Sequence, residues 1–396
     1  MLKPSINNSE TIINLSKCNN NNEFNIINVN TSVGFSHAKI VSFTQSGLNQ
    51  EGNKKTNQDN FIVLTNVLKS LQDFMIFGVF DGHGENGHLI SLQIKLFLND
   101  YYDETKLYEY WKKIKHKNED DKLDLDNLQI LLKHGNFAYI RNCITHLVCK
   151  IKEDYKEISK ESGSTLNLLF IIGCKEIISC NIGDSRSIAF DLKCLNGGKS
   201  LIEEQLTIDH KPEAKEEMER ISNKNGDVFR VCDDLGNYGP YRVFQKGTYY
   251  PGLAMSRSIG DFNYSEIGIS CDPDISLHSY FKGDKKILYN KQPNIEYAKI
   301  FILASDGIWD VWQINEINQF LLKNFSSFFD NIISTSFKNS PKNNVSNNRK
   351  MNENEKLKSD NDCCNLVNKF IYETNLRWER DGLSRDDITF LIIIYY

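Results

Sequence analysis

Five aspartates of this 396-residue chain each lie within a few residues of a short apolar segment: Asp59, Asp81, Asp184, Asp306 and Asp386. If those segments are strands, their ends gather the carboxylates at one rim, where like charges repel one another unless a cation compensates them. Carboxylate oxygens are hard ligands, and no Cys or His spacing typical of zinc accompanies them, so the ion indicated is Mg²⁺ or Mn²⁺. Two such ions a few ångströms apart would activate a water for attack on phosphorus.

Each of these positions also has a simpler explanation. Asp81–Gly82 and Asp306–Gly307 are turn dipeptides, in which glycine supplies the positive φ that a tight turn needs. Asp184 follows an apolar run, where the end of a strand explains it equally well. The recurrence of acids at several strand ends, rather than any single motif, indicates a metal site.

The elements that must position these acids follow from the hydrophobic pattern. Runs rich in Ile, Val, Phe and Leu predict strands at 60–64, 74–80, 166–172, 176–181, 187–190, 300–304 and 388–395. Amphipathic stretches predict helices that begin near Glu85, Asp126, Pro212, Gln313 and Asn365. Many strands occur before any regular βαβ rhythm, and helices interrupt them in pairs, so the order favours an α+β sandwich over a doubly wound sheet.

Two Asn-rich stretches contrast with this pattern. The first thirty residues contain ten asparagines, and a second polar stretch covers about 338–362. Such segments cannot bury enough apolar surface to offset the entropy of ordering them. We therefore expect residues 1–38 and the insertion at 338–362 to be poorly ordered, and residues 39–396 to form one catalytic domain.

Composition excludes several classes of protein. Hydrophobic residues make up 40% and charged residues 25%, which are ordinary globular values. The net charge of −5 argues against a nucleic-acid binder, and no apolar run approaches the roughly 20 residues of a membrane span. The N-terminus lacks a signal-peptide pattern, and the ten cysteines include no C-x-x-C pair, so free thiols in a reducing compartment are expected. We expect a monomer in the cytoplasm, the nucleus or both.

Eight motifs in order carry a resemblance to a known family. They are NQD (57–59), VFDGHG (79–84), SGST (162–165), NIGDSR (181–186), DHKP (209–212), LAMSRSIGD (253–261), LASDGIWD (303–310) and SRDDIT (384–389). Over about 41–396 the chain resembles the metal-dependent protein serine/threonine phosphatases of type 2C, the PPM family, in the Asn-Gln-Asp form of plant and protozoan members. The resemblance implies a four-layer α-β-β-α sandwich of two central antiparallel sheets, with a binuclear Mn²⁺ or Mg²⁺ site at one end.

The resemblance also implies roles for the acids. Asp81 matches the carboxylate that bridges the two ions, and Gly82 matches a ligand that binds through its carbonyl oxygen. Asp306 and Asp386 match further ligands of one ion, and Asp59 matches an acid that orients metal-bound waters. Few direct protein ligands leave several waters on the ions, and a metal-bridging hydroxide then attacks the phosphorus.

His83 matches the family's general acid, which protonates the departing serine or threonine oxygen. A lone histidine is usually structural, but its place two residues after Asp81, between two glycines, favours the acid. Asp184 matches a residue of a weaker third metal site, with a strand-end turn as the alternative. Asp261 is expected to be a structural acid that supports the loop beneath the site.

Two lysines and a long loop are candidates for substrate contact. Lys54 and Lys55 lie near the place where animal members carry an arginine that grips the substrate phosphate. Lys54, five residues before Asp59, is the better match by spacing, and a solvated lysine pair is the alternative of equal weight. Lysine would hold phosphate as a point charge, without the fork of arginine. Gln58 stands where animal members have glutamate, so the rim carries one negative charge fewer in this chain. Residues 228–250 match the flap beside the cleft, and we expect this Gly-rich, aromatic loop to select substrates.

The sequence thus predicts a phosphatase that acts on phosphoproteins in signalling. Its alternative is a catalytically silent family member that binds phosphoproteins as a scaffold, although such proteins typically lose metal ligands that are all matched here. A two-metal nuclease also fits clustered carboxylates, but the negative net charge and the lack of a basic stripe count against it.

Overall fold

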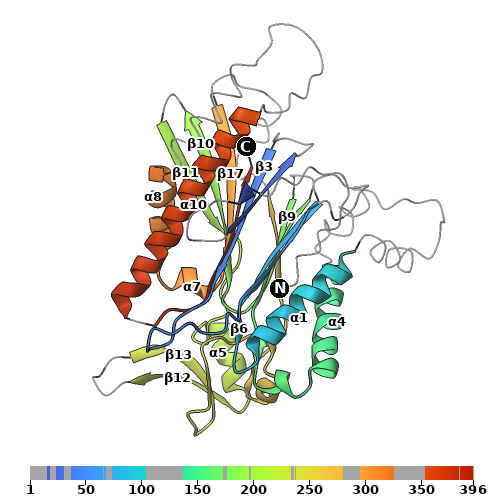
Figure 1. Cartoon of the computed structure of the whole chain (residues 1–396). Coiled ribbons are helices and arrows are strands. Elements are labelled where there is room, and N and C mark those ends of the chain that lie inside the picture. Colours follow the sequence, from blue (N-terminus) through green and yellow to red (C-terminus); the bar gives the residue numbers. More distant parts are fainter. Residues whose placement is uncertain are drawn as a thin grey trace, which may run out of the picture.

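Two antiparallel sheets pack face to face in the computed structural model, and helices cover the outer face of each (Figure 1). The structure describes residues 16–17, 24–30, 37–65, 67, 74–103, 137–172, 176–195, 198–232, 236, 238–279, 295–324, 353–382 and 384–395. The predicted α+β sandwich of four layers is confirmed.

The larger sheet has seven strands, and each pairs antiparallel with its neighbours. In spatial order they are β1 (Ser16–Lys17), β2 (Phe24–Asn30), β3 (His37–Gln45), β18 (Ile388–Tyr395), β17 (Ile295–Ala304), β10 (Arg186–Leu195) and β11 (Gly198–Gln205). Strand β18 therefore lies at the centre of the sheet.

The smaller sheet has five antiparallel strands. They are β16 (Asp274–Ser279), β9 (Glu176–Ile182), β8 (Leu166–Ile172), β5 (Phe74–Phe80) and β4 (Asn60–Leu64). All seven predicted strands are present, and β4, β5, β8 and β18 have the predicted bounds.

Both faces of the central strands are buried, which explains their continuous apolar runs. On β5, Phe77 and Val79 lie in the cluster between the two sheets, whereas Ile76 and Phe80 lie in the cluster under the helices. Successive side chains of a strand point to opposite faces. A strand covered on both sides therefore needs apolar residues at consecutive positions, and β5 is buried along its whole length.

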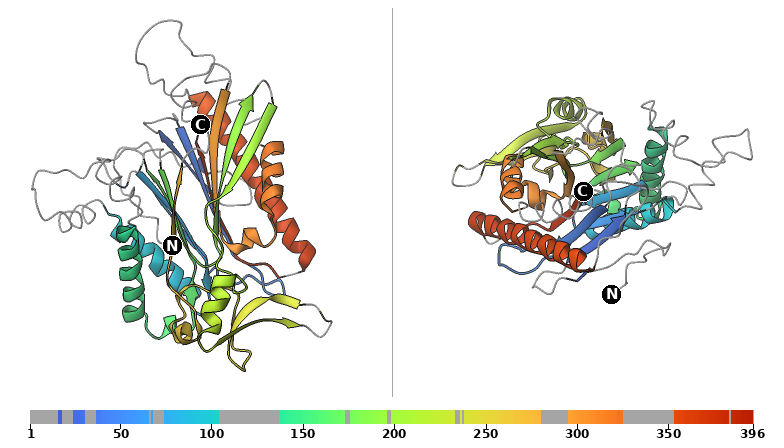
Figure 2. Two further views of the ribbon diagram at one scale, coloured as in Figure 1. Left: turned by 180° about the vertical axis from the view of Figure 1, so that it is seen from behind. Right: turned by 90° about the horizontal axis from the view of Figure 1, so that it is seen from above.

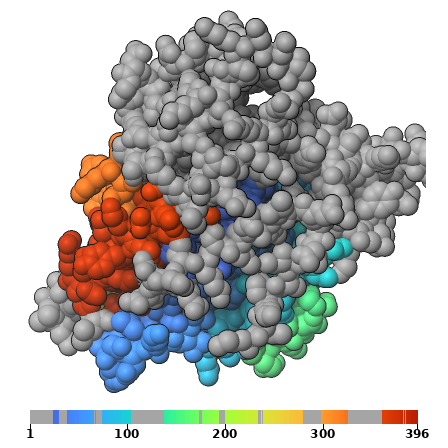
Figure 3. All heavy atoms as spheres, turned by 45° about the horizontal axis from the view of Figure 1, so that its top comes forward, coloured from blue at the N-terminus to red at the C-terminus, as the bar shows by residue number. Residues whose placement is uncertain are grey.

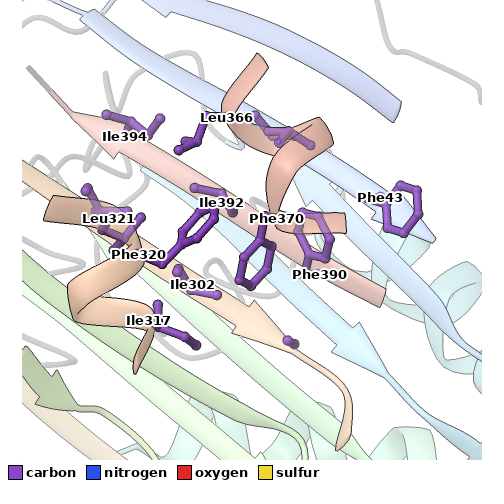
Figure 4. Close-up of a cluster of buried hydrophobic side chains, with 14 of the residues drawn as sticks. Phe43, Ile302, Ile317, Phe320, Leu321, Leu366, Phe370, Phe390, Ile392 and Ile394 are labelled. Carbon is purple, nitrogen blue, oxygen red and sulfur yellow. The ribbon is translucent and has the colours of Figure 1, made fainter. Parts of the chain in front are cut away.

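Helices α1 (Gly87–Tyr101) and α4 (Ala138–Asp154) cover the smaller sheet, and α8 (Ile314–Asn324) and α10 (Glu353–Asp381) cover the larger one (Figure 2). Side chains of α8 and α10 lie next to each other on one face of the molecule (Figure 3). Beneath them Phe370 of α10 packs against Phe320 of α8 and Phe390 of β18, with ring centroids 5.4 and 5.3 Å apart (Figure 4). No helix in the described part of the chain is long and apolar enough to cross a bilayer.

Smaller elements gather at one end of the sandwich. A three-stranded sheet contains β6 (Gly82–His83), β7 (Gly163–Ser164) and β15 (Ile259–Gly260). A separate unit has its own small core and consists of α5 (Lys215–Ser222), β12 (Gly226–Cys232), β13 (Tyr238–Gln245), β14 (Pro251–Leu253) and the 3₁₀ helix η2 (Phe262–Ile267). Two further short helices are α7 (Asp306–Trp309) and η1 (Ile158–Lys160).

Some boundaries differ from the predictions. Strand β2 lies inside the segment 1–38 that was expected to be poorly ordered, and it buries Phe24 and Ile26 in the core, so its few apolar residues suffice to join an existing sheet edge. Helix α10 begins at Glu353, inside the predicted insertion 338–362, and α4 was not predicted. The helix predicted near Asp126 falls outside the described residues. Cys364 is disulfide-bonded, contrary to the expectation of free thiols.

Candidate metal centre and active site

Strand pairing brings the predicted acids to one end of the sandwich. In the smaller sheet Asn60 is paired with Phe80, so Asp59 and Asp81, each next to one of these residues, lie at the same edge. In the larger sheet Ala304 is paired with Phe390, which likewise brings together Asp306, at the start of α7, and Asp386, just before β18. The hydroxyl of Ser305 donates a hydrogen bond to Oδ2 of Asp59 at 2.8 Å and so joins the two edges.

The carboxylates perturb one another strongly. Burial, followed by repulsion from Asp306 and Asp59, raises the pKa of Asp81 well above its usual value. Burial and repulsion from Asp184 and Asp386 do the same to the pKa of Asp306. Burial and the charge of Asp387 raise the pKa of Asp59 to about 7. The charged forms are therefore costly unless a cation is present.

Three of these acids have a buried oxygen without a hydrogen-bond donor, namely Oδ1 of Asp59, Asp184 and Asp306. Buried polar atoms are almost always paired, so unpaired acceptors at one rim are what a divalent cation with its waters would satisfy. In the described part of the chain, no three acidic, His or Cys side chains converge closely enough to hold an ion by themselves. The residues therefore fit ions that take their remaining ligands from waters or backbone carbonyls.

The glycines after Asp81 and Asp306 are needed for close packing, not for positive φ. A Cβ atom on Gly82 would lie 2.4 Å from the carbonyl oxygen of Gly87, and one on Gly307 would lie 2.0 Å from that of Asp387. Neither glycine has a left-handed backbone. The turn explanation of the two Asp-Gly pairs is therefore wrong, because crowding excludes larger residues here.

The SGST motif holds the backbone of Asp81. The N–H of Asp81 donates to Oγ1 of Thr165 at 2.9 Å, and the N–H of Thr165 donates to the carbonyl of Asp81 at 2.8 Å. The Thr165 hydroxyl also lies 2.7 Å from that of Ser185. Sequence reasoning missed this role, since nothing in the motif's spacing identifies its partner.

His83 lies in β6, where its backbone pairs with Gly163 of β7. Nε2 of His83 lies 2.5 Å from Oδ2 of the fully buried Asp261. Burial lowers the pKa of His83, but the charge and hydrogen bond of Asp261 outweigh it and raise the pKa overall. Asp261 thus contacts the candidate acid directly, whereas the sequence suggested only a loop support.

The two candidate phosphate-binding lysines differ in position. Nζ of Lys55 lies 3.0 Å from Oδ1 of Asp386, and the side chains are 38% and 50% exposed. Burial lowers the pKa of Lys55, but the carboxylates around it, led by Asp386, raise the pKa overall. Lys54 is exposed, and its backbone bridges to Leu48. The structure brings Lys55 to the acids, whereas spacing along the chain favoured Lys54.

Asp184 is held by a lysine that sequence reasoning did not single out. Nζ of Lys211, from the DHKP motif, lies 2.5 Å from Oδ2 of Asp184. Arg186 pairs with Asp209 through two hydrogen bonds of 2.8 and 2.6 Å. One oxygen of Asp184 is therefore neutralised, and the other is unpaired.

Gln58 braces the loop that carries His83. Its side-chain amide donates to the carbonyl of Gly84 at 2.7 Å, and its backbone N–H donates to Oδ2 of Asp387 at 2.8 Å. A glutamate at this position has no proton to donate to that carbonyl at neutral pH. The glutamine therefore has a structural use in addition to the charge that it removes.

The flap is an exposed hairpin of β12 and β13. Tyr238 and Tyr249 are 62% and 78% exposed. Arg230 donates to the carbonyl of Gly239 within the flap, and Arg242 donates to the carbonyl of Gly252 in the adjacent strand β14. Both arginines are therefore engaged by backbone carbonyls of the flap or of β14 beside it.

Residues 46–348 match the family model described as Protein phosphatase 2C. The chain belongs to the protein phosphatase 2C family. Its members are serine/threonine protein phosphatases, so the chain is an enzyme of this class, and the resemblance drawn from the eight motifs is confirmed.

Plant relatives named protein phosphatase 2C extend the match. "Probable protein phosphatase 2C 73" and "Probable protein phosphatase 2C 34" of Arabidopsis thaliana are 31% and 32% identical over 285 and 270 residues. The matches cover 71% and 67% of this chain, and 69% and 66% of the relatives. The chain therefore spans about two thirds of the length of these protein phosphatase 2C relatives.

Solved structures share the fold of the protein phosphatase 2C family at lower identity. Serine-threonine phosphatase 2C from Toxoplasma gondii superposes with a TM-score of 0.57 at 20% identity, over 94% of this chain and 99% of that chain. A C. elegans sex-determining protein gives a TM-score of 0.50 at 18% identity, over 90% of this chain and 64% of that one. These two likenesses show the fold alone.

Proposed function

We propose that the chain hydrolyses phosphoserine and phosphothreonine in proteins with the help of two Mn²⁺ or Mg²⁺ ions. Asp81, the Gly82 carbonyl, Asp306 and Asp386 would hold the ions, and Asp59 would orient the waters on them. When bound, the ions would supply a hydroxide nucleophile and neutralise the charge of the phosphate. A third, weaker ion would use the unpaired oxygen of Asp184.

The observation that carries this proposal is the electrostatic state of the rim. Asp81 and Asp306 come from different sheets, yet repulsion from Asp306 adds to burial in raising the pKa of Asp81. Burial and repulsion from Asp184 and Asp386 raise the pKa of Asp306 in the same way. Proteins rarely bury unpaired like charges, because each costs several kcal/mol, about 1–3 per missing hydrogen bond alone. A cation at this rim would remove that penalty, which supports the proposed metal site.

The chain's own side chains would do the remaining work. His83 would donate a proton to the departing serine or threonine oxygen, which leaves poorly as an alkoxide. Lys55 lies beside Asp386, and it would hold the substrate phosphate as a point charge once ions occupy the carboxylates. These roles extend the motif resemblance, and the position of Lys55 favours it over Lys54.

The flap would select substrates through its exposed tyrosines, since its two arginines are engaged by backbone carbonyls. Aromatic side chains supply large contact area at low entropic cost. Exchange of residues 228–250 for a short loop should change the ranking of phosphopeptides by kcat/KM. An unchanged ranking would remove the flap from substrate selection.

The central test is metal-dependent turnover of a phosphothreonine peptide. Activity should require Mn²⁺ or Mg²⁺, disappear in EDTA and return when Mn²⁺ is added. Asp306→Asn should lower kcat at least about 100-fold, whereas the exposed Asp272→Asn should be active as a matched control. Turnover that persists in EDTA would refute the proposal. A protein that binds the phosphopeptide without hydrolysing it would instead be the silent scaffold.

A further inference from the structure

Asp261 comes from the end of β15 and reaches His83 across the small three-stranded sheet. Its Oδ2 lies 2.5 Å from Nε2 of His83, and the residue is fully buried. The hydroxyl of Ser258 donates to the same Oδ2 at 2.5 Å. The backbone N–H of Asp261 donates to the carbonyl of Ser162 at 3.1 Å. Both the carboxylate and the backbone of Asp261 are therefore fixed by neighbouring residues.

The backbone of Asp261 has a conformation that non-glycine residues rarely adopt. Its φ is 52°, in the left-handed region. Such residues cost free energy of the order of 1–3 kcal/mol and concentrate at functional sites, where the surrounding structure compensates for them. The left-handed backbone of Asp261 therefore fits a residue with a functional contact.

The strand between the two residues leaves room for their contact. A Cβ atom on Gly163 would lie 2.4 Å from Oδ2 of Asp261 and 2.9 Å from Nε2 of His83. Any larger residue at position 163 would therefore push the pair apart. Strands β6, β7 and β15 together place His83 and Asp261 at hydrogen-bonding distance across Gly163.

We propose that Asp261 is a positioning residue that orients the His83 ring and fixes which nitrogen delivers the proton. The inference rests on the proposed function, in which His83 is the general acid. An ionised carboxylate can only accept a hydrogen bond, so Nε2 keeps its proton and donates it to Asp261. The proton that can leave is therefore the one on Nδ1.

Nδ1 of His83 is buried and has no hydrogen-bond partner. Unpaired buried polar atoms are rare, and the oxygen of a bound substrate would supply the missing partner. When the phosphorus–oxygen bond breaks, the serine or threonine oxygen keeps the bonding electron pair and takes the proton from Nδ1. His83 is then neutral, with Nε2–H still donated to Asp261.

The test compares two leaving groups on the full chain with Mn²⁺. A phosphothreonine peptide needs a proton on its leaving oxygen, whereas p-nitrophenyl phosphate releases a stable phenolate without one. Asp261→Asn should lower kcat on the peptide about 10- to 100-fold and on p-nitrophenyl phosphate less than about 3-fold. Asparagine has the same shape and tolerates the left-handed backbone, so the fold should persist, which thermal unfolding would verify.

Three companion variants complete the experiment. His83→Gln should show the same dependence on leaving group, and the double variant should be no worse than His83→Gln alone, because the two residues act as a unit. Asp272→Asn, an exposed aspartate eleven positions away, is the matched control. The Mn²⁺ concentration for half-activation should be the same in the wild type and all four variants.

The outcomes distinguish failure of the Asp261 positioning role from failure of the proposed phosphatase mechanism. Suppose that the loss of kcat in His83→Gln depends on the leaving group. Asp261 then does not position the acid if Asp261→Asn lowers kcat equally on the peptide and on p-nitrophenyl phosphate, lowers neither, or requires more Mn²⁺. If His83→Gln is indifferent to the leaving group, the general-acid assignment fails, and the inference fails with it. An inactive wild-type protein with Mn²⁺ would overturn the proposed function itself.

Discussion

Replacement of Asp59 by asparagine tests the electrostatic strain at the rim. The pKa of Asp59 is raised to about 7 from 3.8, chiefly by burial, so its ionised form is penalised in the folded protein. A pKa unit corresponds to about 1.4 kcal/mol, which makes the penalty about 4 kcal/mol above pH 7, as an upper bound. Asp59→Asn should therefore stabilise the metal-free protein at about pH 8.

The pH dependence has a definite sign. An acid whose pKa is raised by folding binds more protons in the folded state between the two pKa values, so it lowers stability progressively as pH rises from about 4 to 7. The gain from Asp59→Asn should thus fall to about 2 kcal/mol near pH 5 and vanish below pH 4. At roughly 1 to 2 °C per kcal/mol for a chain of this size, the melting temperature in EDTA should rise by about 4 to 8 °C at pH 8.

Thermal unfolding of both proteins in EDTA at several pH values measures this directly. The exposed Asp272→Asn serves as the control and should change the melting temperature by less than about 1 °C. Saturating Mn²⁺ should stabilise the wild type and so shrink the advantage of the variant, because cations compensate the charge. A variant that is less stable than wild type at pH 8, or whose gain does not depend on pH, would refute the account of the rim.

Three further predictions concern packing, substrate and ion pairing. Gly307→Ala places a methyl group against the carbonyl of Asp387, so it should cost more than about 1–3 kcal/mol and abolish Mn²⁺-dependent activity; wild-type unfolding and turnover would contradict this. Lys55→Met should raise KM for a phosphopeptide about 10-fold, and Lys54→Met less than 2-fold; equal effects would remove the distinction. Burial raises the pKa of Glu217, but hydrogen bonds to its carboxylate outweigh burial and lower the pKa overall, so the ionised side chain should stabilise the protein above about pH 4. Glu217→Gln should therefore cost about 1–3 kcal/mol of unfolding free energy at pH 7, and urea unfolding should show no such loss at low pH.

The strands that the sequence identified well are those buried on both faces. Strands such as β5 and β18 carry uninterrupted apolar runs, and their bounds follow from composition alone. Strand β2, with the sequence FNIINVN, was missed because asparagines alternate irregularly with its apolar residues. Its place in the sheet depends on pairing with β3, which no local pattern reveals.

The candidate site shows the same division. Motifs indicated Asp81, His83 and Asp306, because an acid next to the end of an apolar run, and a histidine two residues after such an acid, can be recognised from the sequence. The residues that hold them, such as Thr165 and Asp261, lie 84 and 178 positions from their partners. Spacing along the chain carries no information on such contacts, and only the fold brings the atoms together.

The central place of β18 has a consequence for assembly. Its neighbours on either side are β3 and β17, and Ile388 pairs with Gln45. The larger sheet is therefore complete only when segments from distant parts of the chain have paired. Contacts of such long sequence separation form slowly, because the loop between them must lose its entropy first. Deletion of the last strand would therefore split the larger sheet into two unconnected parts, rather than trim an edge, and would take Asp386 with it if the cut fell before that residue.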